Sequence, residues 1–267
     1  MNTQYLNTES GRIAYDESGT GQLVVCIPSM GDLRAEYRLL APQLVAGGFR
    51  VLSMDVRGHG ESSTTWQDFS VAGVGSDLLA LARKLNSGPA LIVATSMAAG
   101  AAIWAAAEAP EWVKGLVLIG PFVRGETNLP DRLLYAALFS RPWGPAMWGM
   151  YYKSLYPARK PADFTEYCAA LRANLREPGR MESLQHMLTA PKSASEQRIS
   201  RVKAPALVLM GSKDPDFKQP EAEAQWVANQ LGARYEMIPD AGHYPHAEMP
   251  EKSGPLVMSF LNSLKTK

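Results

Sequence analysis

Short apolar runs alternate along the chain with segments whose apolar residues have helical spacing. Four strands are predicted in the first half of the chain, at residues 23–27, 50–56, 90–94 and 113–119, and the runs at 23–27 and 90–94 are continuously apolar. Segments with helical spacing lie between them, at residues 37–46, 71–85 and 97–109. Continuous apolar runs are typical of strands that are covered on both faces. The alternation therefore predicts an α/β fold with a mostly parallel central sheet flanked by helices.

The same pattern returns near the end of the chain, and a different one opens it. Residues 3–17 alternate between apolar and polar positions and break at Gly11, which predicts an antiparallel hairpin. The remaining predicted elements are strands at residues 206–210 and 235–238 and helices at residues 221–231 and 251–264. We therefore expect one core domain that is built from residues 1–121 and 199–267.

Residues 122–198, between these two parts, contain no convincing central strand. They are rich in aromatic residues and are divided into helical pieces by prolines. We expect them to form a helical cap over the carboxyl edge of the sheet, where such sheets bind ligands. Most of the aromatic residues should form the cap's own core, and a few should face substrate. The residues expected to bind substrate are Met30, Phe122, Tyr135, Trp143, Trp148, Tyr152 and Tyr244.

Ser96 stands where the apolar run at residues 90–94 meets an alanine-rich helical segment. At a sharp turn from strand to helix a serine hydroxyl projects from the sheet, and the flanking residues must be small. This nucleophile elbow is usually written Gly-x-Ser-x-Gly, and here it is Ala94-Thr95-Ser96-Met97-Ala98. A serine before a helix is also a frequent N-cap, so the motif alone does not establish a nucleophile.

Composition limits the partners and the compartment. Of the 267 residues, 46% are hydrophobic and 20% are charged, and the formal net charge is +1. We therefore expect no nucleic-acid partner and no membrane association, and no apolar run reaches transmembrane length. No signal peptide is visible, and two cysteines, Cys26 and Cys168, favour a reduced cytoplasmic protein, although a disulfide between them stays open. We expect no metal and no cofactor.

Three candidate groups follow predicted strands in a definite order: Ser96, then Asp214, then His243. This is the order found in α/β-hydrolases. The chain resembles that superfamily over nearly its full length. Besides the elbow, the resemblance rests on Pro28-Ser29-Met30-Gly31, Asp55-x-x-Gly58-x-Gly60-x-Ser62, Gly211-x-x-Asp214 and Gly242-His243.

The resemblance implies a serine nucleophile with two supporting side chains. Ser96 would attack the substrate, His243 would take its proton and return it to the leaving group, and Asp214 would orient the imidazole. The backbone N–H groups of Met97 and Met30 would form the oxyanion hole. Many relatives have His-Gly before the second of these donors, whereas this chain has proline and serine there. The donor is a backbone group, so the conformation of that loop decides the geometry of the expected oxyanion hole.

Other residues compete for the same roles. His246 follows closely after the candidate base, but the Ala-Gly-His-Tyr-Pro context favours the earlier histidine. His59 is interpreted as part of a turn, and His186 has no partner that the sequence identifies. Asp216 competes with Asp214 for the role of the acid, and the Gly-x-x-Asp spacing favours Asp214.

The nucleophile narrows the reaction. Epoxide hydrolases and haloalkane dehalogenases of this fold place an aspartate at the elbow, so Ser96 favours esters, lactones, thioesters or some carbon–carbon bonds. The main hypothesis is a carboxylesterase, a monomer or homodimer, whose ester-like substrate has small to medium apolar groups. The alternatives are a haloperoxidase or perhydrolase with the same triad, and a small-molecule receptor on a hydrolase scaffold.

Overall fold

Eight strands form one sheet at the centre of the computed structural model, which describes residues 2–125 and 128–265. The strands are β1 (Gln4–Thr8), β2 (Gly11–Ser18), β3 (Gln22–Ile27), β4 (Phe49–Met54), β5 (Ala90–Thr95), β6 (Val113–Ile119), β7 (Ala206–Gly211) and β8 (Arg234–Ile238). Their order across the sheet is β1-β2-β4-β3-β5-β6-β7-β8. β1 and β2 pair antiparallel and β2 pairs antiparallel with β4, whereas β3 to β8 are parallel. The predicted hairpin and mostly parallel sheet are confirmed.

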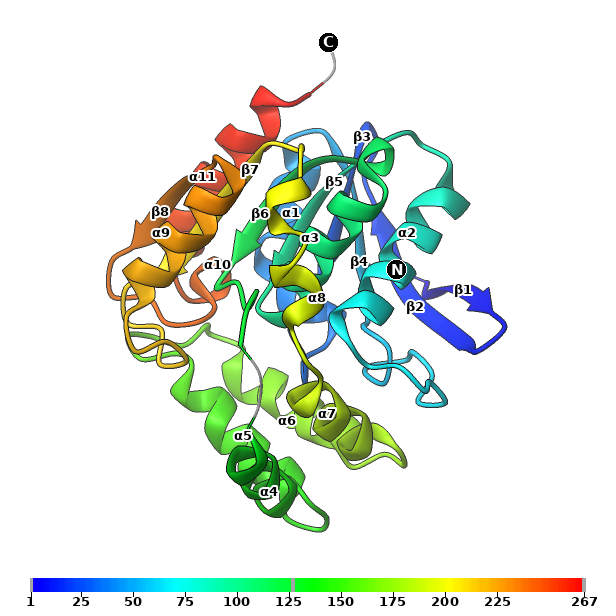
Figure 1. Cartoon of the computed structure of the whole chain (residues 1–267), viewed down its shortest axis with the longest axis vertical. Coiled ribbons are helices and arrows are strands. Elements are labelled where there is room, and N and C mark those ends of the chain that lie inside the picture. The colour runs from blue at the N-terminus through cyan, green and yellow to red at the C-terminus, as the bar shows by residue number, and fades with distance from the viewer. Residues whose placement is uncertain (1, 126–127, 266–267) are drawn as a thin grey trace.

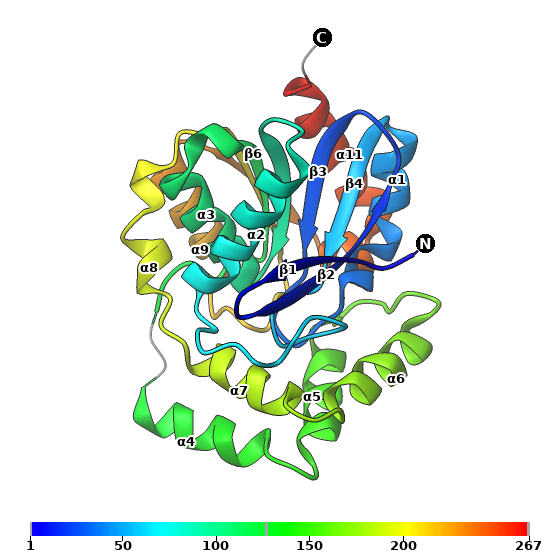
Figure 2. The same cartoon turned by 90° about the vertical axis from the view of Figure 1, so that its right-hand side faces the viewer.

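Helices cover both faces of the sheet (Figure 2). One face packs against α1 (Ala41–Ala46) and α11 (Pro250–Ser263), and the other against α2 (Val71–Leu85), α3 (Met97–Glu108) and α9 (Pro220–Leu231). The shorter core elements are the 3-10 helices η1 (Arg34–Leu39), η2 (Pro110–Trp112) and η3 (Ile199–Arg201) and the helix α10 (Pro245–Glu248).

Alternation of side chains along each strand creates two hydrophobic cores. In β3, Val25 belongs to the core that includes α2 and α3, whereas Val24 and Cys26 belong to the core that includes α1 and α11. All three side chains are fully buried. Burial of one aliphatic side chain contributes about 1.5–3 kcal/mol. A strand covered on both faces thus explains why its sequence is a continuous apolar run.

A layer of helices covers one end of the sheet, below it in Figure 1. It consists of α4 (Leu129–Leu138), α5 (Gly144–Ser154), α6 (Phe164–Leu175) and α7 (Arg180–Thr189). Its side chains form a third hydrophobic cluster, in which Trp148 and Tyr152 meet Tyr244 of the core. The next helix, α8 (Ser193–Glu196), contacts α2 and α3 instead. The helices between β6 and β7 are therefore consistent with a cap.

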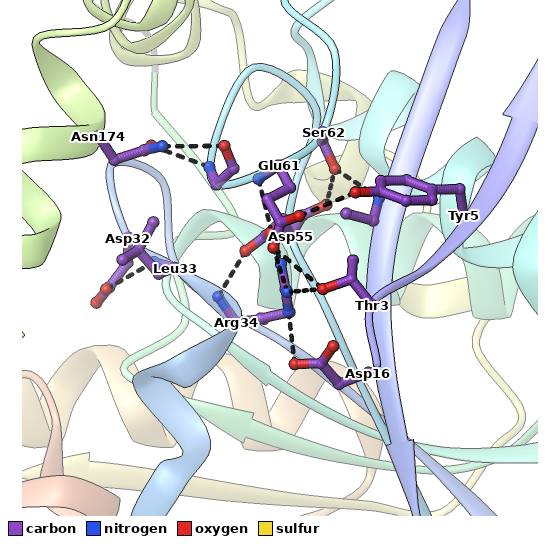
Figure 3. A network of polar contacts seen from close by, with 12 residues as sticks. Thr3, Tyr5, Asp16, Asp32, Leu33, Arg34, Asp55, Glu61, Ser62 and Asn174 are labelled. Carbon is purple, nitrogen blue, oxygen red and sulfur yellow. Dashed lines mark hydrogen bonds and ion pairs between the residues drawn. The ribbon is translucent and has the colours of Figure 1, made fainter. Parts of the chain in front are cut away.

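Two polar contacts show which end of the sheet this layer covers. The indole Nε1 of Trp148 donates to the carbonyl oxygen of Gly31, after β3, at 2.9 Å. Asn174 of α6 exchanges hydrogen bonds of 2.9 and 3.0 Å with the backbone of Gly60, after β4 (Figure 3). Both loops follow parallel strands, so the layer lies over the carboxyl edge of the sheet.

Ion pairs fix the turn that follows β4, and Figure 3 shows Arg34 among three carboxylates. Its guanidinium donates to Asp16 at 2.7 Å and to Glu61 at 2.6 Å, and it also contacts Asp55. The N–H of Glu61 and the hydroxyl of Ser62 donate to Asp55 at 2.9 and 2.8 Å. The Asp-x-x-Gly-x-Gly-x-Ser motif therefore forms a turn that also contacts the cap helix α6, through Gly60 and Asn174.

The segment predicted as one helix at residues 37–46 is two elements in the structure. η1 ends at Leu39, and α1 begins at Ala41 with Pro42 in its first turn. Proline has no N–H for the helical hydrogen-bond ladder and its ring clashes with the preceding turn. The proline is tolerated at the start of a new helix, so the chain restarts there.

The structure also bears on the cysteines and on membrane insertion. Cys26 in β3 is buried, Cys168 in α6 is partly buried, and both thiols are free. None of the described helices is long and apolar enough to span a bilayer.

Candidate active site

Ser96 lies at a sharp turn between β5 and α3. Its backbone has φ 61° and ψ −126°, a region that non-glycine residues rarely adopt and that typically costs about 1–3 kcal/mol. Ser96 occupies the N-cap position of α3, but its side chain accepts no capping hydrogen bond. Capping therefore does not explain this serine, and its hydroxyl is not committed to the helix.

Close packing and two hydrogen bonds fix this turn. Both alanines that replace the glycines of the elbow motif are fully buried. A Cβ on Gly100, in the first turn of α3, would lie 2.8 Å from the carbonyl oxygen of Phe122. The N–H of Ser96 donates to Ile119 at 2.8 Å, and its carbonyl accepts from the N–H of Phe122 at 3.1 Å. The turn is thus bound to the end of β6.

His243 and Asp214 meet at the same end of the sheet, in the loops after β8 and β7. Nδ1 of His243 lies 2.7 Å from Oδ2 of Asp214, and both side chains are buried. Gly120 faces the imidazole, since a Cβ on it would lie 2.9 Å from Cε1 of His243. Gly120 directly follows Ile119, whose carbonyl oxygen accepts the hydrogen bond from the N–H of Ser96. The structure therefore gathers all three predicted side chains at the carboxyl ends of the strands.

Asp216 places a second carboxylate beside the imidazole. Its Oδ2 lies 3.7 Å from Nδ1 of His243, the nitrogen that Asp214 contacts more closely. The hydroxyl of Tyr151, from the cap helix α5, donates to both oxygens of Asp216 at 2.7 and 2.8 Å. Burial raises the pKa of Asp216. The charge of His243 lowers this pKa and the charge of Asp214 raises it, and the net shift is upward.

The electrostatic surroundings favour a protonated imidazole. Burial by itself lowers the pKa of His243, but the charges of Asp214 and Asp216 outweigh it and raise the pKa to about 9. A base that must carry a positive charge during the reaction is stabilised by such carboxylates. The arrangement can therefore support proton transfer at Nε2 while Nδ1 is held by Asp214.

A buried carboxylate fixes the loop after β3. Oε2 of Glu36 accepts from the N–H of Ser29 at 2.8 Å, and Oε1 lies 3.1 Å from Nε2 of His246. The hydroxyls of Ser29 and Tyr244 are 2.6 Å apart. Burial raises the pKa of Glu36 to about 7. The loop so held carries Met30, whose N–H donates to no acceptor in the described part of the chain.

The other histidines have packing roles. His246 is fully buried, and its ring stacks on that of Tyr37 in η1 with 5.1 Å between the ring centroids. Burial lowers the pKa of His246 to about 3. His59 is buried in the turn after β4, with Nδ1 3.0 Å from the carbonyl oxygen of Arg57. His186 of α7 stacks on Phe69 at 5.5 Å.

A cavity of about 490 Å³ lies under the cap, beside this group. Asp216 and Phe122 belong to its wall, and both are neighbours of His243. Of the residues expected to bind substrate, four line the cavity: Met30, Phe122, Tyr135 and Trp148. The structure does not bring the others there. Trp143 is 52% exposed, and Tyr152 and Tyr244 are buried in the hydrophobic cluster of the cap.

Three residues of the site region were not singled out from the sequence: Glu36, Tyr151 and Lys192. Tyr151 is one of many aromatic residues in the cap, and nothing in its spacing marks it as the partner of Asp216. Glu36 and Lys192 are charged residues that a sequence pattern places at the surface.

Asp214, Asp216 and His243 also offer possible metal ligands, with donor atoms within 4.8 Å of one another. The hydrogen bond between Nδ1 of His243 and Oδ2 of Asp214 explains why these atoms lie close together. A metal ion would need the same two atoms as ligands. The donor set fits an imidazole held by carboxylates.

Comparison with known proteins identifies the family. Residues 22–250 match the alpha/beta hydrolase fold, so the chain belongs to that family. A 2-hydroxy-6-oxononadienedioate/2-hydroxy-6-oxononatrienedioate hydrolase from Burkholderia vietnamiensis is 28% identical over 282 residues, covering 97% of this chain and 95% of the relative.

Solved structures share this fold along their whole length. A thermophilic esterase from Thermogutta terrifontis superposes with a TM-score of 0.82 at 21% identity, covering 100% of both chains. A bromoperoxidase from Bacillus anthracis gives a TM-score of 0.84 at 18% identity, covering 98% of this chain and 100% of the other.

Proposed function

We propose that the protein is a serine hydrolase of the carboxylesterase type, with Ser96 as its nucleophile. The observation that supports this most strongly is the backbone of Ser96, which is held at φ 61° without a capping role for the side chain. Strain of this kind persists only where the surrounding structure enforces it, and it is concentrated at functional sites. The hydrogen-bonded pair of His243 and Asp214 at the same end of the sheet supports the assignment.

The proposed reaction has two steps through an acyl-enzyme. The hydroxyl of Ser96 attacks the ester carbonyl as Nε2 of His243 takes its proton, and the alcohol then leaves with that proton. Water attacks the acyl-enzyme with His243 as the base again, which releases the acid and restores Ser96. Asp214 holds the Nδ1–H of the imidazole and stabilises its charge, and Asp216 contributes further negative charge.

Two backbone N–H groups are proposed to stabilise the oxyanion. Met97 is the first residue of α3, so its N–H has no acceptor within the helix. Met30 supplies the other, and the contact between Glu36 and the preceding Ser29 would hold its loop in place. The buried carboxylate of Glu36 would thus hold the Pro-Ser part of this loop through the N–H of Ser29. Loss of one such donor typically costs about 10²–10³ in turnover.

The cavity supports an apolar substrate group of small to medium size. Aromatic and aliphatic side chains make up most of its wall, including Tyr135, Phe139 and Trp148. We propose that residues 122–198 act as a cap domain on the core of residues 1–121 and 199–267. Residues 126–127 of this cap lie outside the described part of the chain.

Hydrolysis of 4-nitrophenyl esters of increasing acyl length tests the proposal. The wild type should turn over these esters with an optimum set by the cavity, and Ser96→Ala should reduce kcat by at least about 10³. Ser76→Ala is the matched control, because the Ser76 hydroxyl bonds only within α2, to Ala72. A fluorophosphonate should label the wild type at Ser96. Equal hydrolysis by wild type and Ser96→Ala, with no label on Ser96, would falsify the assignment.

A further inference from the structure

Lys192 is a buried cation without a partner among the described residues. Three cationic side chains of the described residues are less than a tenth exposed: Arg57, Arg180 and Lys192. Arg57 pairs with Asp77 at 2.7 Å, and Arg180 pairs with Glu177 at 3.2 Å. The ammonium of Lys192 makes no hydrogen bond or ion pair with any described residue. Lys192 thus differs from every other buried cation in the described chain.

The position of Lys192 suggests where its counter-charge comes from. It lines the cavity that Met30, Phe122 and Asp216 also line, so its side chain borders the space next to His243. Burial lowers the pKa of Lys192, and no carboxylate of the described residues acts against this effect. Buried charges are costly unless they are paired. An anion that enters the cavity would supply the pairing that the described residues do not provide.

The backbone of Lys192 is anchored through α8 to the core helix α3. Both the N–H and the hydroxyl of Ser195 donate to the carbonyl oxygen of Lys192, at 3.0 and 3.1 Å. The Ser195 hydroxyl packs against α3, since a Cβ on Gly100 would lie 2.9 Å from it. Gly100 is four residues after Ser96 on the same helix. The candidate nucleophile and Lys192 are therefore held by one rigid element.

The other charged side chains that line the cavity are either paired within the protein or partly exposed. Arg124 is already paired with Glu223, at 2.6 Å. Both carboxylate oxygens of Asp216 accept hydrogen bonds from the hydroxyl of Tyr151. Asp131 lies in the first turn of α4 and is partly exposed. Lys192 is the one buried, uncompensated charge among the described residues of the wall.

We propose that Lys192 binds a carboxylate of the substrate, so that the enzyme prefers esters or lactones whose acyl part carries a second, ionised carboxyl group. A single ammonium in an apolar wall suits a group with one negative charge, whereas phosphate is usually held by several donors. This inference rests on the proposed hydrolase function, because it specifies the substrate class of the same site. Lys192 acts here as a specificity residue that contacts the end of the substrate remote from the scissile bond.

Two matched substrates test this inference. The first is the mono-4-nitrophenyl ester of adipic acid, which has a free carboxylate, and the second is the corresponding ester of adipic acid monoamide, which is neutral and of equal length. Each is measured with wild type, Lys192→Met, Lys192→Arg and the exposed control Lys203→Met. Wild type and Lys203→Met should favour the anionic ester in kcat/KM by about tenfold or more. Lys192→Met should bring the ratio of kcat/KM for the anionic ester over the amide close to one, and Lys192→Arg should keep most of the preference.

The possible outcomes separate this inference from the proposed function. Hydrolysis of both esters with no preference for the carboxylate, or a preference that survives in Lys192→Met, overturns the role of Lys192 and leaves the hydrolase assignment intact. Absence of any Ser96-dependent hydrolysis overturns the hydrolase assignment. Calorimetric binding of adipate to Ser96→Ala, weakened at least about tenfold by the added Lys192→Met, supports the carboxylate site independently of turnover. Equal binding by the two variants contradicts it.

Discussion

The indole of Trp148 donates a hydrogen bond to the carbonyl oxygen of Gly31, 2.9 Å away, and lies directly over that glycine. Gly31 has φ 70°, and a Cβ on it would lie 2.2 Å from Cζ2 of the indole. Trp148 belongs to the cap, whereas Gly31 directly follows Met30 in the loop proposed to hold the oxyanion. The cap and the proposed oxyanion loop are therefore in van der Waals contact at one residue.

Gly31→Ala should separate these two elements. The clash with Trp148 should displace the indole or the loop, lower kcat/KM for esters by about tenfold or more, and destabilise the protein by about 1–3 kcal/mol. Gly88→Ala is the matched control, because Gly88 has φ 77° and open space around it. It should cost only the backbone strain and leave kcat/KM unchanged. Activity and urea unfolding of both variants measure the effects, and equal behaviour of the two would show that the contact is unimportant.

The backbone of Ser96 makes a prediction about stability. At φ 61° an alanine keeps the strain, whereas a glycine relieves it. Ser96→Gly should therefore be more stable than Ser96→Ala by about 1 kcal/mol, although both lack the hydroxyl. The free energies of unfolding in urea give this difference.

The reverse order is expected where the backbone is helical. At Ser76, on the exposed side of α2, glycine should be less stable than alanine by about 1 kcal/mol. If Ser96→Ala proved as stable as Ser96→Gly while the Ser76 pair behaved as expected, the strain at Ser96 would be refuted.

The carboxylates around His243 predict the pH dependence of ester hydrolysis. The proposed base acts in its neutral form, so kcat/KM should rise with pH up to about 9, the pKa of His243. At lower pH the rate should fall about tenfold per pH unit. Asp216 raises that pKa, so Asp216→Asn should lower it and move the rising limb to lower pH.

Asp240→Asn is the control for this profile, because Asp240 is an exposed carboxylate that pairs with Lys213 at 2.7 Å. It should leave the limb in place. A limb that stays unchanged in Asp216→Asn would show that the second carboxylate has no electrostatic effect on the base.

Glu36 should affect both stability and turnover through the N–H of Ser29. Glu36→Ala leaves that buried donor without its acceptor, which should destabilise the protein by about 1–3 kcal/mol. The released loop should also lower kcat by about tenfold to hundredfold, less than the deletion of an oxyanion donor. Glu36→Gln keeps an acceptor oxygen and should retain most of the activity. A fall in stability with unchanged kcat in Glu36→Ala would restrict Glu36 to a structural role.

Much of the fold is visible in the sequence because hydrophobic burial acts locally along each element. The predicted helix at residues 71–85 and strand at residues 113–119 coincide with α2 and β6, since their apolar spacing and flanking Gly-Pro or charged residues define both ends. The helix predicted at residues 37–46 was wrong in its continuity. There, Pro42 interrupts a pattern whose spacing alone is helical.

The candidate site is predictable only in part, for a different reason. The order of Ser96, Asp214 and His243 could be read because parallel strands bring their following loops to one edge. The contacts of Glu36 with Ser29 and His246 could not, because they depend on how a turn and a distant loop meet in space. In the cap, several aromatic residues are equivalent in sequence, and only the packing distinguishes Trp148 at the cavity from the exposed Trp143.

The anchoring of Lys192 has an evolutionary consequence. Lys192 lies after α7, near the end of the proposed cap segment, and is fixed through Ser195 to α3 of the core, whereas the aromatic wall of the cavity comes largely from α4 and α5. Recombination or drift that replaced α4–α7 would change the shape available to the apolar part of a substrate and leave the ammonium in place. If Lys192 binds the substrate carboxylate as proposed, the two parts of substrate recognition reside on separately exchangeable segments, and variants can diversify in acyl-chain length while keeping their selection for charge.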